Sequence, residues 1–231
     1  MSAYSTLLLL WIVLSPVSPA DPATYLDDLK SELKNEWPNN RTINLVFHGH
    51  SVPAGYFKTP VVNTLEAYPY QLLRQIKARY PHAVVNVINT SIGGENSQSG
   101  EKRFVAEVLP HRPDVLFIDY ALNDRSIGLA EARKAWESMI MEALKKNIKV
   151  ILLTPSPDQR VDLLTPGNEL EQHALQIEQL ASAHGIGLAD SYSLFKKQVQ
   201  HGENVADYMS QVNHPNAKGH ALIADELMTF F

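Results

Sequence analysis

Two residues of this sequence have the types needed for nucleophilic catalysis, although they lie far apart in the chain. Ser51 follows an apolar run in "FHGHSVPAGY", and His214 stands in "VNHPN", a turn bounded by Asn and Pro. A neutral imidazole, whose ordinary pKa is about 6.5, can remove the proton of a serine hydroxyl and make it a nucleophile. Such a pair could carry acyl transfer. Taken singly, Ser51 also fits a helix N-cap, and His214 also fits a solvated loop histidine.

Acyl transfer also requires hydrogen-bond donors for the oxyanion that develops in the transition state. Gly94 in "NTSIGGENS" offers a backbone N–H that a ligand can approach closely, and Asn123 in "ALND" offers a side-chain amide. Each segment is also typical of an ordinary turn, a glycine-rich turn in one case and an Asx turn in the other. The combination is more informative than either residue alone.

These residues could meet only if the elements between them form a sheet that gathers its loops at one edge. Five apolar runs have the length and composition of strands: 43–47, 83–88, 114–118, 148–153 and 185–189. Helix-period apolar residues occupy the segments 65–79, 98–109, 130–146, 168–184 and 216–230. This alternation predicts an α/β fold, a five-stranded parallel sheet covered by helices on both faces.

The polar segments that follow the predicted strands would lie at the edge where such sheets bind ligands. "HGHS", "NTSIGGENS", "DYALNDRS" and "TPSPDQR" follow the first four strands in order. In open parallel sheets, ligands bind outside the carboxyl ends of the strands. The segment 52–63 has no strong pattern and is long enough to be a functional loop.

Composition narrows the possible partners. The 231 residues carry a net charge of -5, and the 20 Lys and Arg form no basic block, so we expect no nucleic-acid partner. The length suits one domain. The chain has no Cys, which excludes disulfides and thiolate metal sites. His48 and His50, with His214 and His220, could suggest zinc, but no carboxylate-bearing metal signature accompanies them, so we expect no metal and no cofactor.

The first twenty residues are typical of a secretory signal. The apolar run "TLLLLWIVL" precedes "SPVSPA", which has small residues at the positions of a cleavage site, although no Lys or Arg precedes the run. A buried helix or a membrane anchor is the alternative, but the run is short for a bilayer. We expect cleavage after Ala20, a secreted or periplasmic protein, and no stable membrane association after cleavage.

A helix is also predicted just after this signal. Leu26, Leu29, Leu33 and Trp37 are spaced three and four residues apart in "TYLDDLKSELKNEW", which places them on one apolar stripe that ends at Pro38.

The four segments that contain these candidate catalytic residues together resemble those of a known family. Ser51 in "FHGHSVPAGY", Gly94 in "NTSIGGENS", Asn123 in "ALND" and His214 in "VNHPN" are similar to the four blocks of the SGNH, or GDSL-type, esterase and acylhydrolase superfamily, in the family's order over residues 43–220. The resemblance implies a flavodoxin-like three-layer α/β/α sandwich over residues 21–231. It also implies hydrolysis through a seryl ester, with an oxyanion hole made by the Ser51 N–H, the Gly94 N–H and the Asn123 side chain.

Three positions depart from the family's pattern. His50 replaces the usual Asp before the serine, Ala121 replaces the Gly of the third block, and Gln211 replaces the Asp three residues before the catalytic His. A triad carboxylate normally orients the imidazole and stabilises its cation. We therefore expect either the Gln211 side-chain carbonyl or a backbone carbonyl to orient His214; otherwise the site is crippled.

The substrate expected from the resemblance is a small-molecule or carbohydrate ester, in particular an acetyl ester of a carbohydrate. A lysophospholipase or thioesterase of the same chemistry and a non-catalytic carbohydrate-binding relative are the alternatives. Tyr56 and Tyr120 are expected to form a substrate-binding wall, although aromatic residues also fill core gaps. Asp124 and Arg125 are expected to be solvated loop charges.

Overall fold

A five-stranded, wholly parallel sheet forms the centre of the protein, as the sequence predicts. The computed structural model describes residues 18–231 and places the strands in the order β2-β1-β3-β4-β5. This is the order of flavodoxin-like folds. The strands are β1 Thr42–Gly49, β2 Val84–Asn89, β3 Val115–Asp119, β4 Lys149–Leu153 and β5 Gly187–Ala189.

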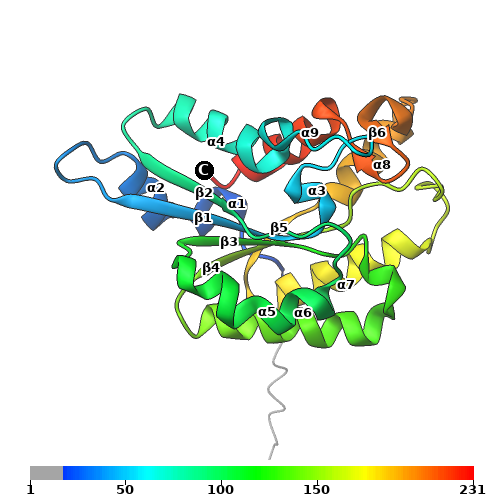
Figure 1. Ribbon diagram of the computed structural model, residues 1–231, viewed down its shortest axis with the longest axis horizontal. Helices are drawn as coiled ribbons and strands as arrows, with labels where there is room; N and C mark the ends of the chain where they lie inside the picture. The colour runs from blue at the N-terminus through cyan, green and yellow to red at the C-terminus, as the bar shows by residue number, and fades with distance from the viewer. Residues whose placement is uncertain (1–17) are drawn as a thin grey trace, which may run out of the picture.

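Helices cover both faces of this sheet and complete the predicted three-layer α/β/α sandwich (Figure 1). Helices α4, α8 and α9 pack on one face, and α5, α6 and α7 cover the other. The helices are α1 Pro22–Tyr25, α2 Asp27–Leu33, α3 Ser51–Ala54, α4 Tyr68–Arg79, α5 Ser97–Arg103, α6 Gly128–Leu144, α7 Glu169–His184, α8 Ser191–Gln200 and α9 Ala217–Met228. Of these, α3 and α8 were not predicted from the sequence.

Two apolar clusters, one on each face, hold the layers together. All five residues of β3 are buried, as expected for a central parallel strand that is covered on both sides. Phe47 of β1 stacks on Phe117 of β3 with ring centroids 4.3 Å apart, within the cluster that also contains residues of α4 and α9. Trp136 of α6 is fully buried in the other cluster. The central strands are therefore held rigidly, and so are the loops that leave their ends.

The sheet reverses its strand order between β1 and β3, and this position determines where a ligand can bind. Chains leave β1 and β3 in opposite directions here, which opens a crevice at the carboxyl ends of these strands. Ser51 lies two residues after the end of β1, and Asn123 lies four residues after the end of β3.

A small hairpin, not predicted from the sequence, faces this crevice. Strand β6 (Met209–Gln211) pairs in antiparallel fashion with β7 (His214–Pro215), and Gln211 lies opposite His214 in the register. The loop after α3 contacts this hairpin through Thr59 and Gln211, and an isolated bridge between Tyr56 and Val62 closes the loop.

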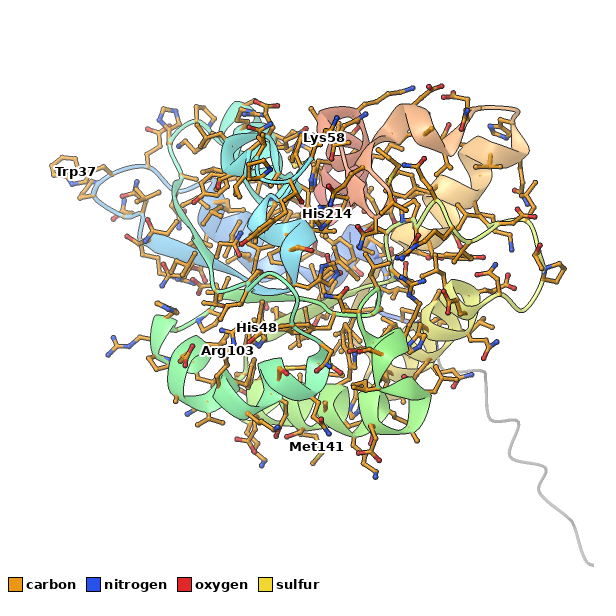
Figure 2. The ribbon with its side chains drawn as sticks, turned by 45° about the vertical axis from the view of Figure 1, so that its right-hand side comes forward. Trp37, His48, Lys58, Arg103, Met141 and His214 are labelled. Atoms are coloured by element: carbon orange, nitrogen blue, oxygen red, sulfur yellow. The ribbon has the colours of Figure 1, made fainter. Side chains whose placement is uncertain are left out.

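The predicted N-terminal helix is shorter than the apolar spacing indicates. It is divided into α1 and α2, and α2 ends at Leu33. Leu26, Leu29 and Leu33 are buried as expected, but the side chain of Trp37 is 84% exposed and points away from the body of the protein (Figure 2). The last position of the stripe was therefore predicted wrongly, because the helix ends before Trp37 can turn toward the core.

The predicted signal at residues 1–20 falls largely outside the described residues, which start at 18. Helix α1 begins at Pro22, and the Asp21 side chain caps it by accepting a hydrogen bond from the Ala23 N–H. None of the helices within residues 18–231 combines the length and the hydropathy of a membrane span.

Helix α7 provides a matched test of the core. Leu180 is fully buried on its inner face, whereas Leu175 of the same helix is 51% exposed. We expect Leu180→Ala to lower the free energy of unfolding by about 2–5 kcal/mol, because it leaves a cavity in close-packed surroundings. Leu175→Ala should change it by less than about 0.5 kcal/mol. Urea denaturation followed by circular dichroism measures both, and equal losses would contradict the assigned packing.

Candidate active site

Ser51 and His214 are hydrogen-bonded to each other in the folded chain. The Ser51 Oγ lies 2.9 Å from the His214 Nε2, and both residues are buried with only a small exposed fraction. Ser51 is the first residue of α3, and the N-cap of this helix is His50, whose Nδ1 accepts a hydrogen bond from the Val52 N–H. Ser51 is therefore free of the capping role and can direct its hydroxyl at the imidazole.

A backbone carbonyl, not a carboxylate, contacts the other ring nitrogen of His214. The His214 Nδ1 lies 3.0 Å from the Phe57 carbonyl oxygen. If the Nε2 is to accept the Ser51 proton, the Nδ1 must carry the ring hydrogen, and only an acceptor can pair with it. Phe57, in the loop after α3, supplies that acceptor.

Gln211 does not present its oxygen to the imidazole, contrary to one of our two expectations. Its Oε1 accepts hydrogen bonds from the Thr59 N–H at 3.0 Å and from the Thr59 hydroxyl at 3.3 Å. Its Nε2 consequently lies 2.7 Å from the His214 Nδ1 and, as a donor, can pair only with an Nδ1 that carries no hydrogen, so it does not orient the tautomer in which the Nδ1 is protonated. A backbone N–H can only donate, so it determines which end of the amide faces Thr59. The geometry favours the backbone-carbonyl alternative for orienting His214.

The surroundings lower the pKa of His214 below its ordinary value. Burial of the imidazole is the main cause, the hydrogen bond to the Phe57 carbonyl works in the opposite direction, and the charge of the nearby His50 lowers the pKa further. A lowered pKa keeps the ring neutral, and so able to accept a proton, at and below neutral pH.

The Ser51–His214 pair opens into a cavity of about 390 Å³ that contains both predicted oxyanion donors. Gly94 lines it with a φ of 83°, a left-handed conformation that favours glycine, and a Cβ there would meet no atom within 4 Å. Asn123 lines it as well, and its Nδ2 donates one hydrogen bond to the Glu95 carbonyl oxygen at 2.8 Å. An amide nitrogen has two hydrogens, so Asn123 retains one for a ligand.

Tyr56 forms part of the cavity wall, as expected for a substrate-binding residue. Its ring centroid lies 6.1 Å from that of His214. A Cβ on Gly93 would lie 3.0 Å from the Tyr56 Cζ, so only glycine lets the ring pack against this loop without a shift.

Tyr120 lies beneath the site and not on its wall, contrary to our prediction. It is fully buried, and its hydroxyl donates to the Glu95 carboxylate at 3.2 Å and contacts the His48 ring. Arg103 pairs with the same carboxylate at 2.6 Å and donates to the Thr90 carbonyl oxygen at 2.7 Å. This network holds both ends of the loop that carries Gly94.

Asp124 is also buried, although we expected a solvated charge. Its carboxylate accepts hydrogen bonds from the Ser97 N–H at 2.7 Å and from the Trp136 Nε1 at 2.6 Å. Burial raises its pKa, and the two hydrogen bonds counteract the increase. Asp124 thus ties the start of α5 to α6 directly behind Asn123.

The histidines considered for zinc have other contacts. The His48 ring is hydrogen-bonded to the Thr90 hydroxyl and to the Gly100 carbonyl oxygen of α5, and its pKa is lowered to about 3, chiefly by burial. The His50 Nε2 lies 3.4 Å from Asp119. In residues 18–231, no group of three or more metal-ligating side chains converges.

Some residues of the site were not found from the sequence. Asn213 and Gly93 line the cavity, and Phe57 contributes through its backbone. Asn213 directly precedes His214 in "VNHPN", so its position was a signal that we did not use. A backbone carbonyl such as that of Phe57 carries no side-chain signal.

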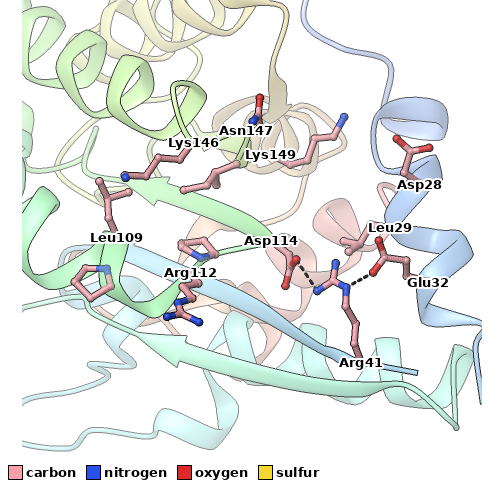
Figure 3. Close-up of a pocket in the computed structure, with 13 residues that line it drawn as sticks. Asp28, Leu29, Glu32, Arg41, Leu109, Arg112, Asp114, Lys146, Asn147 and Lys149 are labelled. Carbon is pink, nitrogen blue, oxygen red and sulfur yellow. Dashed lines mark ion pairs between the residues drawn. The ribbon is translucent and has the colours of Figure 1, made fainter. Parts of the chain in front are cut away.

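A larger cavity lies at the opposite edge of the sheet, near the amino ends of β1, β3 and β4 (Figure 3). Its volume is about 810 Å³, and Arg41 within it pairs with Asp114 and Glu32. Among the described residues, its lining contains no serine and no histidine. The candidate nucleophile and base thus line the smaller of the two cavities.

Comparison with known proteins agrees with this location. The model of the GDSL-like Lipase/Acylhydrolase family matches residues 47–222, a range that includes Ser51, Gly94, Asn123 and His214. No curated protein matches the chain.

Several solved structures are similar to this chain. One is a two-domain esterase (CEX) active on acetylated mannans, with a TM-score of 0.73, 23% sequence identity, and coverage of 89% of this chain and 52% of that chain. Another is Axe2, an acetylxylan esterase from Geobacillus stearothermophilus, with a TM-score of 0.69, 21% identity, and coverage of 80% and 91%. The chain spans about half the length of the first of these, and at such identities the likeness shows the fold.

The contact between Gln211 and His214 leads to a test by NMR. Gln211→Glu keeps the shape of the side chain but places a carboxylate beside the Nδ1, so we expect the pKa of His214 to rise by about one unit or more. Gln211→Met, which has neither charge nor amide, is the control for size. A titration that follows the His214 imidazole protons measures the midpoint. An unchanged midpoint in Gln211→Glu would show that the carboxylate does not reach the ring.

Proposed function

The chain belongs to the GDSL-like lipase/acylhydrolase family, and on this premise we propose that it is a serine carboxylic ester hydrolase that removes acetyl groups from a carbohydrate. The observation that carries the proposal is the 2.9 Å hydrogen bond between the Ser51 Oγ and the His214 Nε2 at the floor of an open cavity.

In the proposed reaction, Ser51 attacks the ester carbonyl while His214 takes the hydroxyl proton at its Nε2. The tetrahedral intermediate then collapses, and His214 returns the proton to the departing alcohol oxygen. The same imidazole then takes a proton from a water molecule as that water attacks the acetyl-serine, and it returns this proton to the Ser51 Oγ as the bond to serine breaks and acetate leaves. Every proton transfer in this proposal uses the His214 Nε2, alternately as base and as acid, and the 2.9 Å contact with the Ser51 Oγ supports this role.

The Ser51 N–H, the Gly94 N–H and the Asn123 amide are the proposed oxyanion donors. Asn123 is held by the Glu95 carbonyl, and Glu95 is in turn held by Arg103. Donors that are already oriented do not have to reorganise when charge develops, which is why such groups lower the barrier effectively.

His214 works in this proposal without a carboxylate partner. The Phe57 carbonyl orients the ring and keeps the hydrogen on the Nδ1, but it supplies no full negative charge to the imidazolium. The imidazole is therefore a weaker base than one in a carboxylate-supported site, and it is neutral over a wider range of pH.

The lining of the cavity supports a short acyl group and a polar alcohol. Besides the two glycines and Tyr56, the side chains around Ser51 are those of Asn123, Gln211, Asn213 and His214, and none is aliphatic. A long acyl chain would gain little by leaving water for such a surface. Structural neighbours that are named for acetylated mannans and acetylxylan support the same substrate class. Export through the signal at residues 1–20 stays a prediction.

A panel of p-nitrophenyl esters tests the reaction and the acyl length. We expect kcat/KM to be highest for the acetate, lower for the butyrate and lowest for the octanoate. Ser51→Ala should abolish turnover and labelling by a fluorophosphonate probe, with an unchanged circular dichroism spectrum. Preference for octanoate would indicate a lysophospholipase or thioesterase, and no turnover by the wild type would indicate a non-catalytic relative.

Asn123→Ala tests the oxyanion hole. An oxyanion donor is used fully only in the transition state, so kcat for p-nitrophenyl acetate should fall by about 10²–10³ while KM changes little. Asn86→Ala, on β2 away from the cavity, controls for the loss of an amide elsewhere. An effect confined to KM would make Asn123 a substrate-binding residue instead.

A further inference from the structure

A second hollow, of about 540 Å³, adjoins the Ser51 cavity. Asn123 and Asn213 line both, so the two hollows share part of their wall. The remaining polar wall of the second hollow includes Arg125, Arg160 and Glu169, none of which has a role in the proposed reaction.

One buried carboxylate holds both arginines in place. The Asp158 side chain is fully buried and accepts hydrogen bonds from the Arg125 Nη2 at 2.6 Å and from the Arg160 Nε and Nη2 at 2.9 and 2.5 Å. Burial alone would raise the pKa of Asp158, but the bonds from Arg160 and Arg125 lower it to about 2. Asp158 is therefore ionised at any ordinary pH and fixes both guanidinium groups.

The two arginines differ in what they can still bind. All three guanidinium nitrogens of Arg125 already donate hydrogen bonds. Their acceptors are the Leu122 carbonyl oxygen and the carboxylates of Asp158 and Glu169. Within the described chain, the Arg160 Nη1 has no hydrogen-bond partner, and the Arg160 side chain is 65% exposed. Arg160 is thus a donor that is already oriented and still available on the wall of the hollow.

The charges of this hollow balance. The two guanidinium groups face two carboxylates, those of Asp158 and Glu169, and the other polar groups are neutral amides and a hydroxyl. An anionic ligand would meet as much repulsion as attraction. A neutral ligand rich in hydroxyl groups would find fixed donors in Arg160 and acceptors in Glu169 and the two Asn side chains.

We propose that this hollow, which we term the Arg160 subsite, binds a neutral sugar unit of the polymer that carries the acetyl ester. The inference rests on the proposed function and specifies where the alcohol part of the substrate lies. An acetyl group needs little of the 390 Å³ around Ser51, and the polar wall of the adjoining hollow suits a pyranose better than an alkyl chain. Val161, which is partly exposed, gives it a small apolar surface for the C–H groups of the ring.

Arg160→Ala and two substrates test the subsite. We expect kcat/KM for acetylated xylotriose to fall about tenfold more than kcat/KM for p-nitrophenyl acetate, which has no sugar, because a charged donor to a hydroxyl is lost. The larger part of the change should lie in KM. Arg112→Ala, an exposed arginine of the cavity at the other edge of the sheet, is the matched control and should leave the ratio of the two values unchanged.

Binding without turnover gives a second, independent measurement. In the Ser51→Ala background, calorimetry should show that Arg160→Ala weakens the binding of unacetylated xylotriose, and a tri-galacturonate should bind no better than the neutral sugar. The subsite would be overturned if Arg160→Ala lowered kcat/KM equally for both esters. It would also be overturned if the Ser51→Ala protein bound no xylotriose or bound the tri-galacturonate more tightly. A wild type that hydrolyses neither ester would instead overturn the proposed function, so the two failures are distinguishable.

Discussion

The hydrogen bond between Ser51 and His214 is the contact on which the remaining arrangement of the site depends. Its two ends come from the carboxyl end of β1 and from the β6–β7 hairpin just before α9, and the bond is only 2.9 Å long. Such a contact between distant parts of the chain survives only if both ends are held by well-packed elements. The stack of Phe47 on Phe117 holds the first end, and the packing of α9 against the sheet holds the second.

A backbone carbonyl occupies the place beside the His214 Nδ1 where a carboxylate would supply negative charge. A carboxylate would orient His214 and also stabilise its cation, whereas the Phe57 carbonyl does only the first. Carboxylates are nevertheless close by. The Glu95 and Asp124 carboxylates support the loops that carry the proposed oxyanion donors, and Asp119 lies beside His50. Negative charge in this protein therefore serves to hold loops in place more than to polarise the base.

Cavity chemistry, and not cavity size, identifies the functional edge of the sheet. The larger space near the amino ends of the strands contains paired charges around Arg41. The smaller one lies at the strand-order reversal, where loops converge and a ligand can touch several elements at once. The neighbouring hollow with Arg160 lies beside it and shares Asn123 and Asn213 with it.

The sequence by itself determined the features that depend on local periodicity and chain order. Apolar runs at strand length, alternating with helical segments, predicted the parallel sheet, and the loop positions of Ser51, Gly94, Asn123 and His214 placed them at one edge of it. Side-chain direction and burial depend on neighbours that are distant in the chain, so only the tertiary structure could decide them. Tyr120 lies under the site because its hydroxyl pairs with Glu95, and the Gln211 oxygen faces Thr59 because it accepts the Thr59 N–H. Trp37 stays exposed because it lies beyond the end of its helix.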